Sequence, residues 1–143
     1  MSHVTPLNLD RLPVGQRTRL AAEVLSTYTR VRWVMRDEDA ERAVGRLRGR
    51  GSAPETQLTA GEQFVAAWRL AHAAGRMLNV LPTDSRCLFR SLTVMCMLDR
   101  RGLDQTVVIA VRPRPFAAHA WVEVDGQPVL PDADPGYERL LEL

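Results

Sequence analysis

The sequence has no lysine, two cysteines and three histidines. All 19 basic residues are arginines, which excludes chemistry through a lysine Schiff base. The cysteines, Cys87 and Cys96, lack the C-x-x-C spacing of a zinc site and are too few for a disulfide framework. We predict them on one helix, where their separation corresponds to a rotation of about 900°, so the thiols face opposite sides.

Segments typical of membranes and cofactors are also absent. No stretch approaches the roughly 20 apolar residues of a membrane-spanning helix, and the start of the sequence lacks the pattern of a signal peptide. We therefore expect a cytoplasmic protein, in which a free thiol stays reduced. Because the sequence contains neither a metal-ligand cluster nor a glycine-rich phosphate loop, we expect no metal and no organic cofactor.

The charge is unevenly distributed, although the net charge is only +2. Residues 1–50 contain ten arginines against six acidic residues, whereas residues 51–143 contain nine against eleven. No aromatic interleaving or binding motif accompanies the basic excess, so we expect no nucleic-acid partner. The excess is more typical of a solvated helix face, or of a patch that meets an acidic peptide or protein.

Three helices are predicted in the first half of the chain. Apolar residues three or four positions apart indicate a helix over about 14–35. Asp37 or Asp39 can cap a shorter second helix. Thr59 and Glu62 form a capping-box pattern before the third.

The second half is predicted to change from helix to strand. A fourth helix is expected over about 85–101, ending before a glycine. Strands are expected at 106–111, 118–124 and 128–130, with Asp125-Gly126 as a hairpin turn and an irregular tail after the last strand.

Cys87 and His119 are the residues best placed for chemistry. A thiol at the start of a helix meets the positive end of the helix dipole, which favours the thiolate, and an imidazole near the start of an adjacent strand can act as its base. The alternatives are a small buried cysteine and a histidine bound to the backbone. The polar neighbours 84–86 favour the reactive cysteine. Cys96, surrounded by apolar residues, is predicted to be buried.

A third catalytic residue would be an aspartate near the next strand, where it could fix the tautomer of the imidazole. Asp132 lies just past that strand and is our candidate. Asp134 and Asp125 are alternatives, but Asp125 lies in the predicted turn and should point to solvent.

The prediction is therefore a single α+β domain over residues 1–143. Residues 1–80 would form a helical N-terminal half. Residues 81–143 would form a catalytic core, in which the helix bearing the nucleophile packs on a small antiparallel sheet.

Four segments resemble the lasso-peptide leader peptidases, a bacterial family with a transglutaminase-like, papain-like fold. They are CLFRSL (87–92), LDRRGL (98–103), VIAVR (108–112) and PFAAHAWVEVDG (115–126). They match the family's C-L-x-R-S helix start, R-R-G-L helix end and F-x-A-H-A-W-V-E strand, in order and at compatible spacing. The resemblance makes Cys87 the nucleophile and His119 the base, with Asp132 the nearest match to the family's acidic residue after Pro131.

The resemblance implies a cysteine peptidase that removes the leader from a ribosomally made lasso-peptide precursor. The reaction would use a Cys-His-Asp triad and a thioester intermediate, without ATP. A separate cyclase then closes the macrolactam and is a further expected partner. Some relatives carry a fused leader-recognition module, and the helical first half resembles no such module. The chain therefore resembles a stand-alone peptidase that works with a leader-binding protein. The alternatives are a non-catalytic precursor-binding adaptor and an acyltransferase of the same fold.

Overall fold

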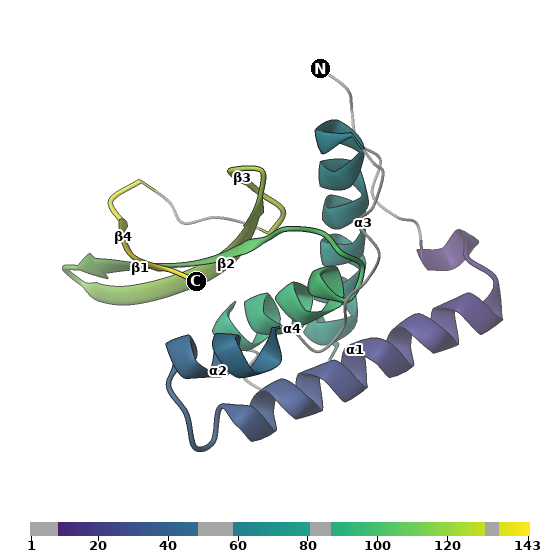
Figure 1. Cartoon of the computed structure of the whole chain (residues 1–143), viewed down its shortest axis with the longest axis horizontal. Helices are drawn as coiled ribbons and strands as arrows, with labels where there is room; N and C mark the ends of the chain where they lie inside the picture. Colours follow the sequence, from purple (N-terminus) through teal and green to yellow (C-terminus); the bar gives the residue numbers. More distant parts are fainter. Residues whose placement is uncertain (1–8, 49–58, 81–86, 131–134) are drawn as a thin grey trace.

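The computed structural model describes residues 9–48, 59–80, 87–130 and 135–143. It is an α+β structure with helices on one side of a four-stranded antiparallel sheet (Figure 1). The elements are η1 (Leu9–Arg11), α1 (Val14–Val34), α2 (Ala40–Leu47), α3 (Ala60–Asn79), α4 (Cys87–Asp99), β1 (Thr106–Pro113), β2 (Phe116–Val124), β3 (Gln127–Pro128) and β4 (Glu138–Glu142).

The four predicted helices are confirmed, and two begin at the expected caps. The side chain of Asp39, not Asp37, caps α2 by accepting from the Arg42 N–H at 2.9 Å. Thr59 and Glu62 form the predicted capping box of α3. After α4 the chain turns at Gly102, whose φ of 70° suits glycine at a helix end.

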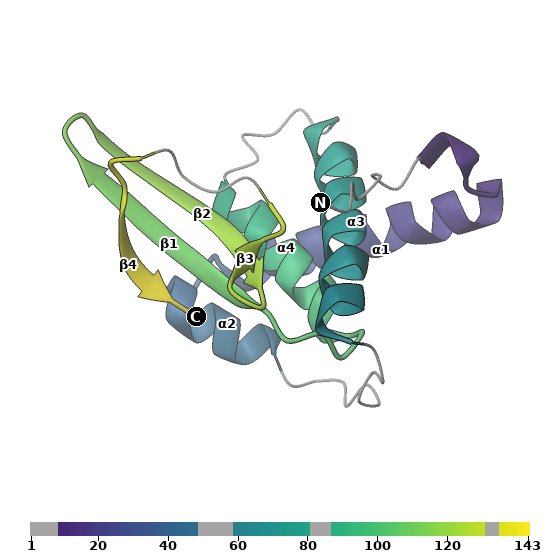
Figure 2. The ribbon, with the colours of Figure 1, turned by 90° about the horizontal axis from the view of Figure 1, so that it is seen from above.

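The sheet has the strand order β3-β2-β1-β4, and every neighbouring pair is antiparallel. β1 and β2 form a long hairpin that extends beyond the helices (Figure 2). Both strands are longer than predicted, because Pro113 pairs with Phe116 and leaves only Arg114 and Pro115 in the turn. Pro113 and Pro115 therefore lie at the tip of the hairpin, where a strand tolerates proline.

The end of the chain differs from the prediction in two ways. The short third strand is present, but it is the two-residue β3 at Gln127–Pro128 and not the expected 128–130. The segment expected to be an irregular tail contains β4, which pairs with β1 at the edge of the sheet. The sequence of β4 lacks β-branched and aromatic residues, so local propensity gives no strand signal, and its pairing with β1 supplies the structure.

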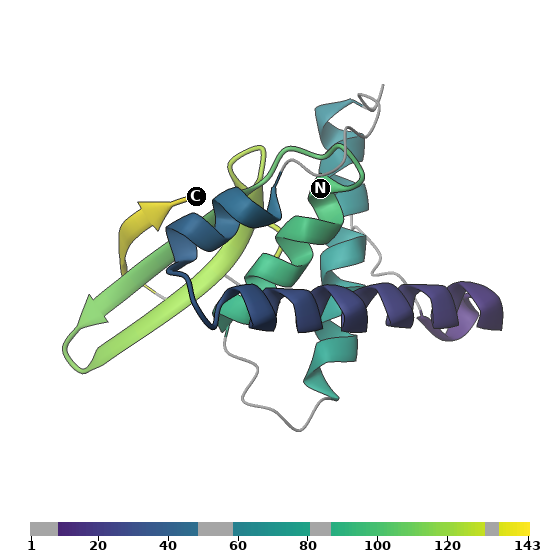
Figure 3. The same cartoon turned by 60° about the horizontal axis from the view of Figure 1, so that its bottom comes forward.

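α4 lies between the sheet and α1, and also packs against α3 (Figures 1 and 3). All eight residues from Ser91 to Leu98 are buried, so the helix contributes to the hydrophobic cluster from every face. Among the described residues, no helix is both long and apolar enough to cross a membrane.

Arginine side chains from the end of α4 connect it to α1. The Arg101 guanidinium donates to both carboxylate oxygens of Glu23, at 2.8 and 2.9 Å, and Arg100 lies 3.7 Å from the same carboxylate. The hydrogen bond from Arg101 is the main cause that lowers the pKa of Glu23 below its ordinary value, against the opposing effect of burial.

Replacing Glu23 with glutamine should reduce the loss of stability in acid. Because the pKa of Glu23 is lower in the folded protein, the unfolded chain takes up a proton first as the pH falls. The contribution is present above the ordinary glutamate pKa of about 4.3 and is lost as the pH falls through the folded value. Urea unfolding between pH 6 and pH 3 should show a smaller loss for Glu23→Gln than for the wild type.

Glu138→Gln, which removes an exposed carboxylate from β4, is the matched control and should keep the wild-type dependence. Parallel pH profiles for wild type and Glu23→Gln would contradict the assignment.

Candidate active site

Cys87 is the first residue of α4, at its half-buried end. The first turn, 87–90, is only partly buried, whereas residues 91–98 of the helix are buried. The Arg90 guanidinium donates to the side-chain oxygen of Asn79 and so connects this turn to the end of α3. The thiol therefore lies at the margin of the core, on a turn held by a neighbouring helix. The predicted capping residues Asp84 and Ser85 lie outside the described residues.

Cys96 differs from Cys87 in its surroundings, as predicted. It is 3% exposed, and burial raises the pKa of its thiol to about 11. Both cysteines are free. A buried, protonated thiol is a poor nucleophile, so Cys96 acts as a core residue.

His119 lies on β2, where it pairs with Ala110 of β1. Its side chain is half-buried, and its ring stacks on Trp121 with centroids 5.9 Å apart and planes at 26°. β2 packs directly against α4. The structure thus brings the strand that carries the histidine against the helix that begins with Cys87.

The three aspartates considered for the third role differ in what the structure describes. Asp132 and Asp134 lie outside the described residues. Asp125 is exposed in the turn after β2, with a φ of 53°. Strand geometry places it roughly 20 Å along β2 from His119, which is too far for a hydrogen bond.

Sequence reasoning missed two residues that support the stacked tryptophan. Glu123 is only 7% exposed and accepts a hydrogen bond from the Trp121 indole at 3.0 Å. Arg139 of β4 donates to the same carboxylate at 2.7 Å and lies over the Trp121 ring, 5.8 Å from its centroid. His119, Trp121 and Glu123 occupy every second position of β2 and therefore share one face of the strand. This spacing is visible in the sequence, but the contact with Arg139 of β4 is not.

Arg139 also binds Glu142, at 2.8 Å on the exposed edge of β4. The hydrogen bonds that Arg139 donates to the Glu142 and Glu123 carboxylates raise the pKa of its guanidinium above the ordinary value. The two carboxylates are not equivalent, because the side chain of Glu123 is 9% exposed and that of Glu142 is 56% exposed. Arg139 therefore neutralises a buried carboxylate beside the imidazole–indole stack.

Within the described part of the chain, no three histidine, cysteine or acidic side chains gather in a way that could hold a metal ion. The chemistry available around Cys87 and His119 is that of a thiol, an imidazole and backbone N–H groups at a helix start. These are the groups of nucleophilic acyl transfer.

A protein-family model described as the transglutaminase-like superfamily matches residues 17–142. The chain is also 45% identical over 63 residues to the microcin J25-processing protein McjB of Escherichia coli. That match covers 44% of this chain and 29% of McjB, so the chain matches less than a third of the relative's length. No solved structure matches the chain significantly.

Removing Arg139 should destabilise the protein more than removing its exposed partner. Arg139→Ala leaves the Glu123 carboxylate buried with only the indole as its described donor, which should lower the free energy of unfolding by about 1–3 kcal/mol. Glu142→Ala removes only an exposed ion pair and should cost less than about 0.5 kcal/mol. Urea denaturation of both variants measures the difference, and equal losses would contradict the role assigned to Glu123.

Alkylation should distinguish the two cysteines in the folded protein. Iodoacetamide at neutral pH should label Cys87, which is partly accessible, and leave Cys96 unlabelled until urea unfolds the chain. Peptide mapping by mass spectrometry locates the label, and Cys87→Ala is the control that should stay unlabelled when folded. Rapid labelling of Cys96 in the native protein would contradict the burial of its thiol.

Proposed function

We propose that this chain, which belongs to the transglutaminase-like superfamily, is a cysteine peptidase that removes the leader from a lasso-peptide precursor. The observation that carries the proposal is the position of Cys87. It begins a buried helix at its half-exposed end, and that helix packs against the strand that bears His119. The partial identity to a protein named for processing a peptide supports the substrate class.

In the proposed mechanism the Cys87 thiolate attacks the carbonyl of the last leader residue. The backbone N–H of Cys87 or its neighbour, at the start of α4, stabilises the oxyanion. Protonated His119 then gives its proton to the amine of the departing core peptide, and a thioester remains on Cys87. His119 takes a proton from water as that water attacks the thioester, which releases the leader and restores the thiol.

Trp121 supports this mechanism by limiting the orientations that the His119 ring can adopt. The indole is itself held by Glu123 and by the Arg139 guanidinium above it. A base whose ring is held in place loses less freedom when it meets the thiol and the substrate. We assign Asp132 the third role, accepting from the other ring nitrogen of His119, with Asp134 as the alternative.

The proposed partners follow from the substrate. The precursor peptide is bound by a separate leader-binding protein, and the macrolactam-forming cyclase uses the product. We place the reaction in the cytoplasm, where the thiol stays reduced. Two other functions remain as outcomes of the test, namely a non-catalytic adaptor that binds the precursor and an acyltransferase that passes the leader acyl group to an amine.

Leader release should require both Cys87 and the leader-binding protein. A lasso-peptide precursor is incubated with this chain, with and without that protein, and the products are identified by mass spectrometry. Cys87→Ala should lower the rate of cleavage by at least about 10³-fold while leaving the folded protein intact. Asp132→Asn should lower it by about 10²–10⁴-fold, because the imidazole loses the acceptor that orients it.

Asp134→Asn is the matched control and should cleave at close to the wild-type rate. The reverse pattern would transfer the third role to Asp134. Cleavage retained in Cys87→Ala would overturn the mechanism. A precursor that binds but is never cleaved would indicate the adaptor, and a leader found attached to an added amine would indicate the acyltransferase.

A further inference from the structure

A pocket of about 480 Å³ lies where the last turns of α1 meet the first turn of α4. Its walls are aromatic and arginine side chains, and Phe89 belongs to the same first turn of α4 as Cys87. The lining residues are Tyr28, Thr29, Arg32, Trp33, Met35, Arg36 and Phe89. Phe89 follows Cys87 by two positions, a rise of about 3 Å and a rotation of about 200°, so the pocket adjoins the helix turn that begins with Cys87 but lies on the opposite face of that turn.

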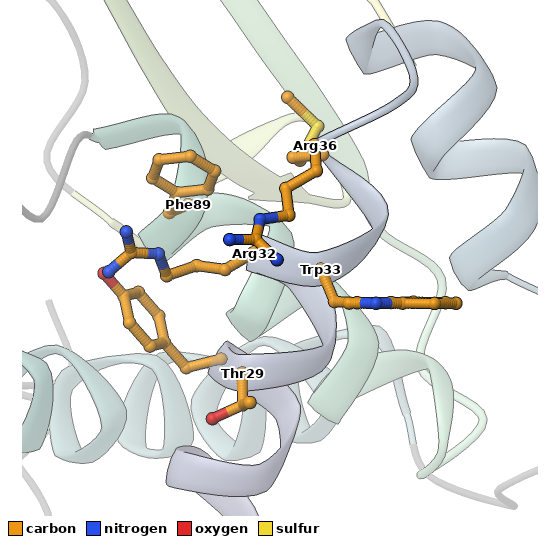
Figure 4. A pocket seen from close by; sticks show the side chains of 7 residues that line it. Thr29, Arg32, Trp33, Arg36 and Phe89 are labelled. Atoms are coloured by element: carbon orange, nitrogen blue, oxygen red, sulfur yellow. The ribbon is translucent and has the colours of Figure 1, made fainter.

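The aromatic side chains of the pocket contact one another and a neighbouring arginine. Phe89 meets Tyr28 edge to face, with centroids 6.4 Å apart and planes at 79°. The Arg32 guanidinium lies 5.9 Å from the centroid of the same tyrosine ring. Figure 4 shows the Arg32 side chain extending below Phe89, the Arg36 guanidinium above the base of Arg32, and the Trp33 indole pointing to the opposite side. Trp33 is 60% exposed although it is a large apolar residue.

In the part of the chain that the structure describes, the two arginines of this pocket have no carboxylate partner. Arg32 lies in the last turn of α1, and Arg36 lies two residues past the end of that helix. Among the described residues neither has a carboxylate within 4.0 Å, whereas Arg46, Arg101 and Arg139 each bind one. As far as the described residues go, the pocket therefore presents positive charge without a carboxylate partner, beside the exposed Trp33.

We infer that this pocket is a subsite for an acidic residue of the peptide substrate, bound with an apolar neighbour. Guanidinium groups bind carboxylates through two hydrogen bonds, and an aromatic wall accepts an apolar side chain at little entropic cost. The volume is large enough for two side chains of a peptide and too small for a folded domain. The inference rests on the proposed function, because it assigns the occupant as a segment of the peptide that reaches Cys87.

The test measures binding in a protein that cannot cleave. Cys87→Ala is titrated into a fluorescein-labelled decapeptide with two glutamates flanking a phenylalanine, and into the same peptide with glutamine at both positions. Fluorescence anisotropy at low salt should show the acidic peptide binding at least about 10-fold more tightly. The preference should decrease at high salt, because the pocket is open and its charges are screened.

The variant Arg32→Gln/Arg36→Gln, in the Cys87→Ala background, should reduce this preference to less than about twofold. The matched control is Arg19→Gln/Arg69→Gln, which removes the same charge from exposed positions on α1 and α3 and should keep the preference. Circular dichroism checks that each variant is folded. A preference that survives in Arg32→Gln/Arg36→Gln, or equal binding of the two peptides, would overturn the inference.

A dimer that depends on these arginines, without peptide binding, would also overturn it by assigning the pocket to a second copy of the chain. Failure of the proposed function has a different signature. The acidic peptide would still bind through Arg32 and Arg36, while no precursor would be cleaved through Cys87.

Discussion

The burial of α4 on every side is the constraint on which the rest of the structure depends. A helix that is apolar all round must be covered all round, and here α1, α3 and the sheet provide that cover. The helix emerges from the core at its first turn and at Asp99, because the other helices and the strands cover residues 91–98. A cysteine in that first turn is partly accessible, and the buried part of the same helix holds it in place. A nucleophile requires this combination of access and rigid support.

Arginine carries out the cross-linking between layers in a protein without lysine. Arg48 of α2 donates to backbone oxygens of Gln105 and Leu143, at 2.8 and 3.0 Å, and so ties α2 to the sheet. Arg101 connects α4 to α1, and Arg139 connects β4 to β2. The planar, multidentate guanidinium suits these contacts, because one side chain can satisfy several acceptors in fixed directions. A single ammonium group would not hold β4 and the indole in the same way.

The helices could be predicted from the sequence because their signals are local. Apolar spacing and the caps at Asp39 and Thr59 lie within the segments that they define. β4 could not be predicted, because two contacts outside its own segment hold it in place. It pairs with β1, and its Arg139 binds Glu123 of β2. For the same reason, only part of the candidate site could be predicted from the sequence. Cys87 and His119 carry their own local context, whereas the support from Glu123 and the pocket between α1 and α4 exist only after folding.

The basic excess of the first half of the chain has a definite location in the folded protein. Three of the six acidic residues there are engaged elsewhere, as Glu23 binds Arg101, Glu38 binds Arg46, and Asp39 caps α2. The charge that remains without a carboxylate partner in the described structure includes Arg32 and Arg36, beside the turn that begins with Cys87. On β2, by contrast, the buried Glu123 carboxylate is matched by Arg139. Under the proposed function, charge is therefore balanced beside the imidazole of His119 and, among the described residues, left without a partner where we propose that the peptide binds. Such an asymmetry would favour an acidic ligand over a purely stabilising role for the two arginines.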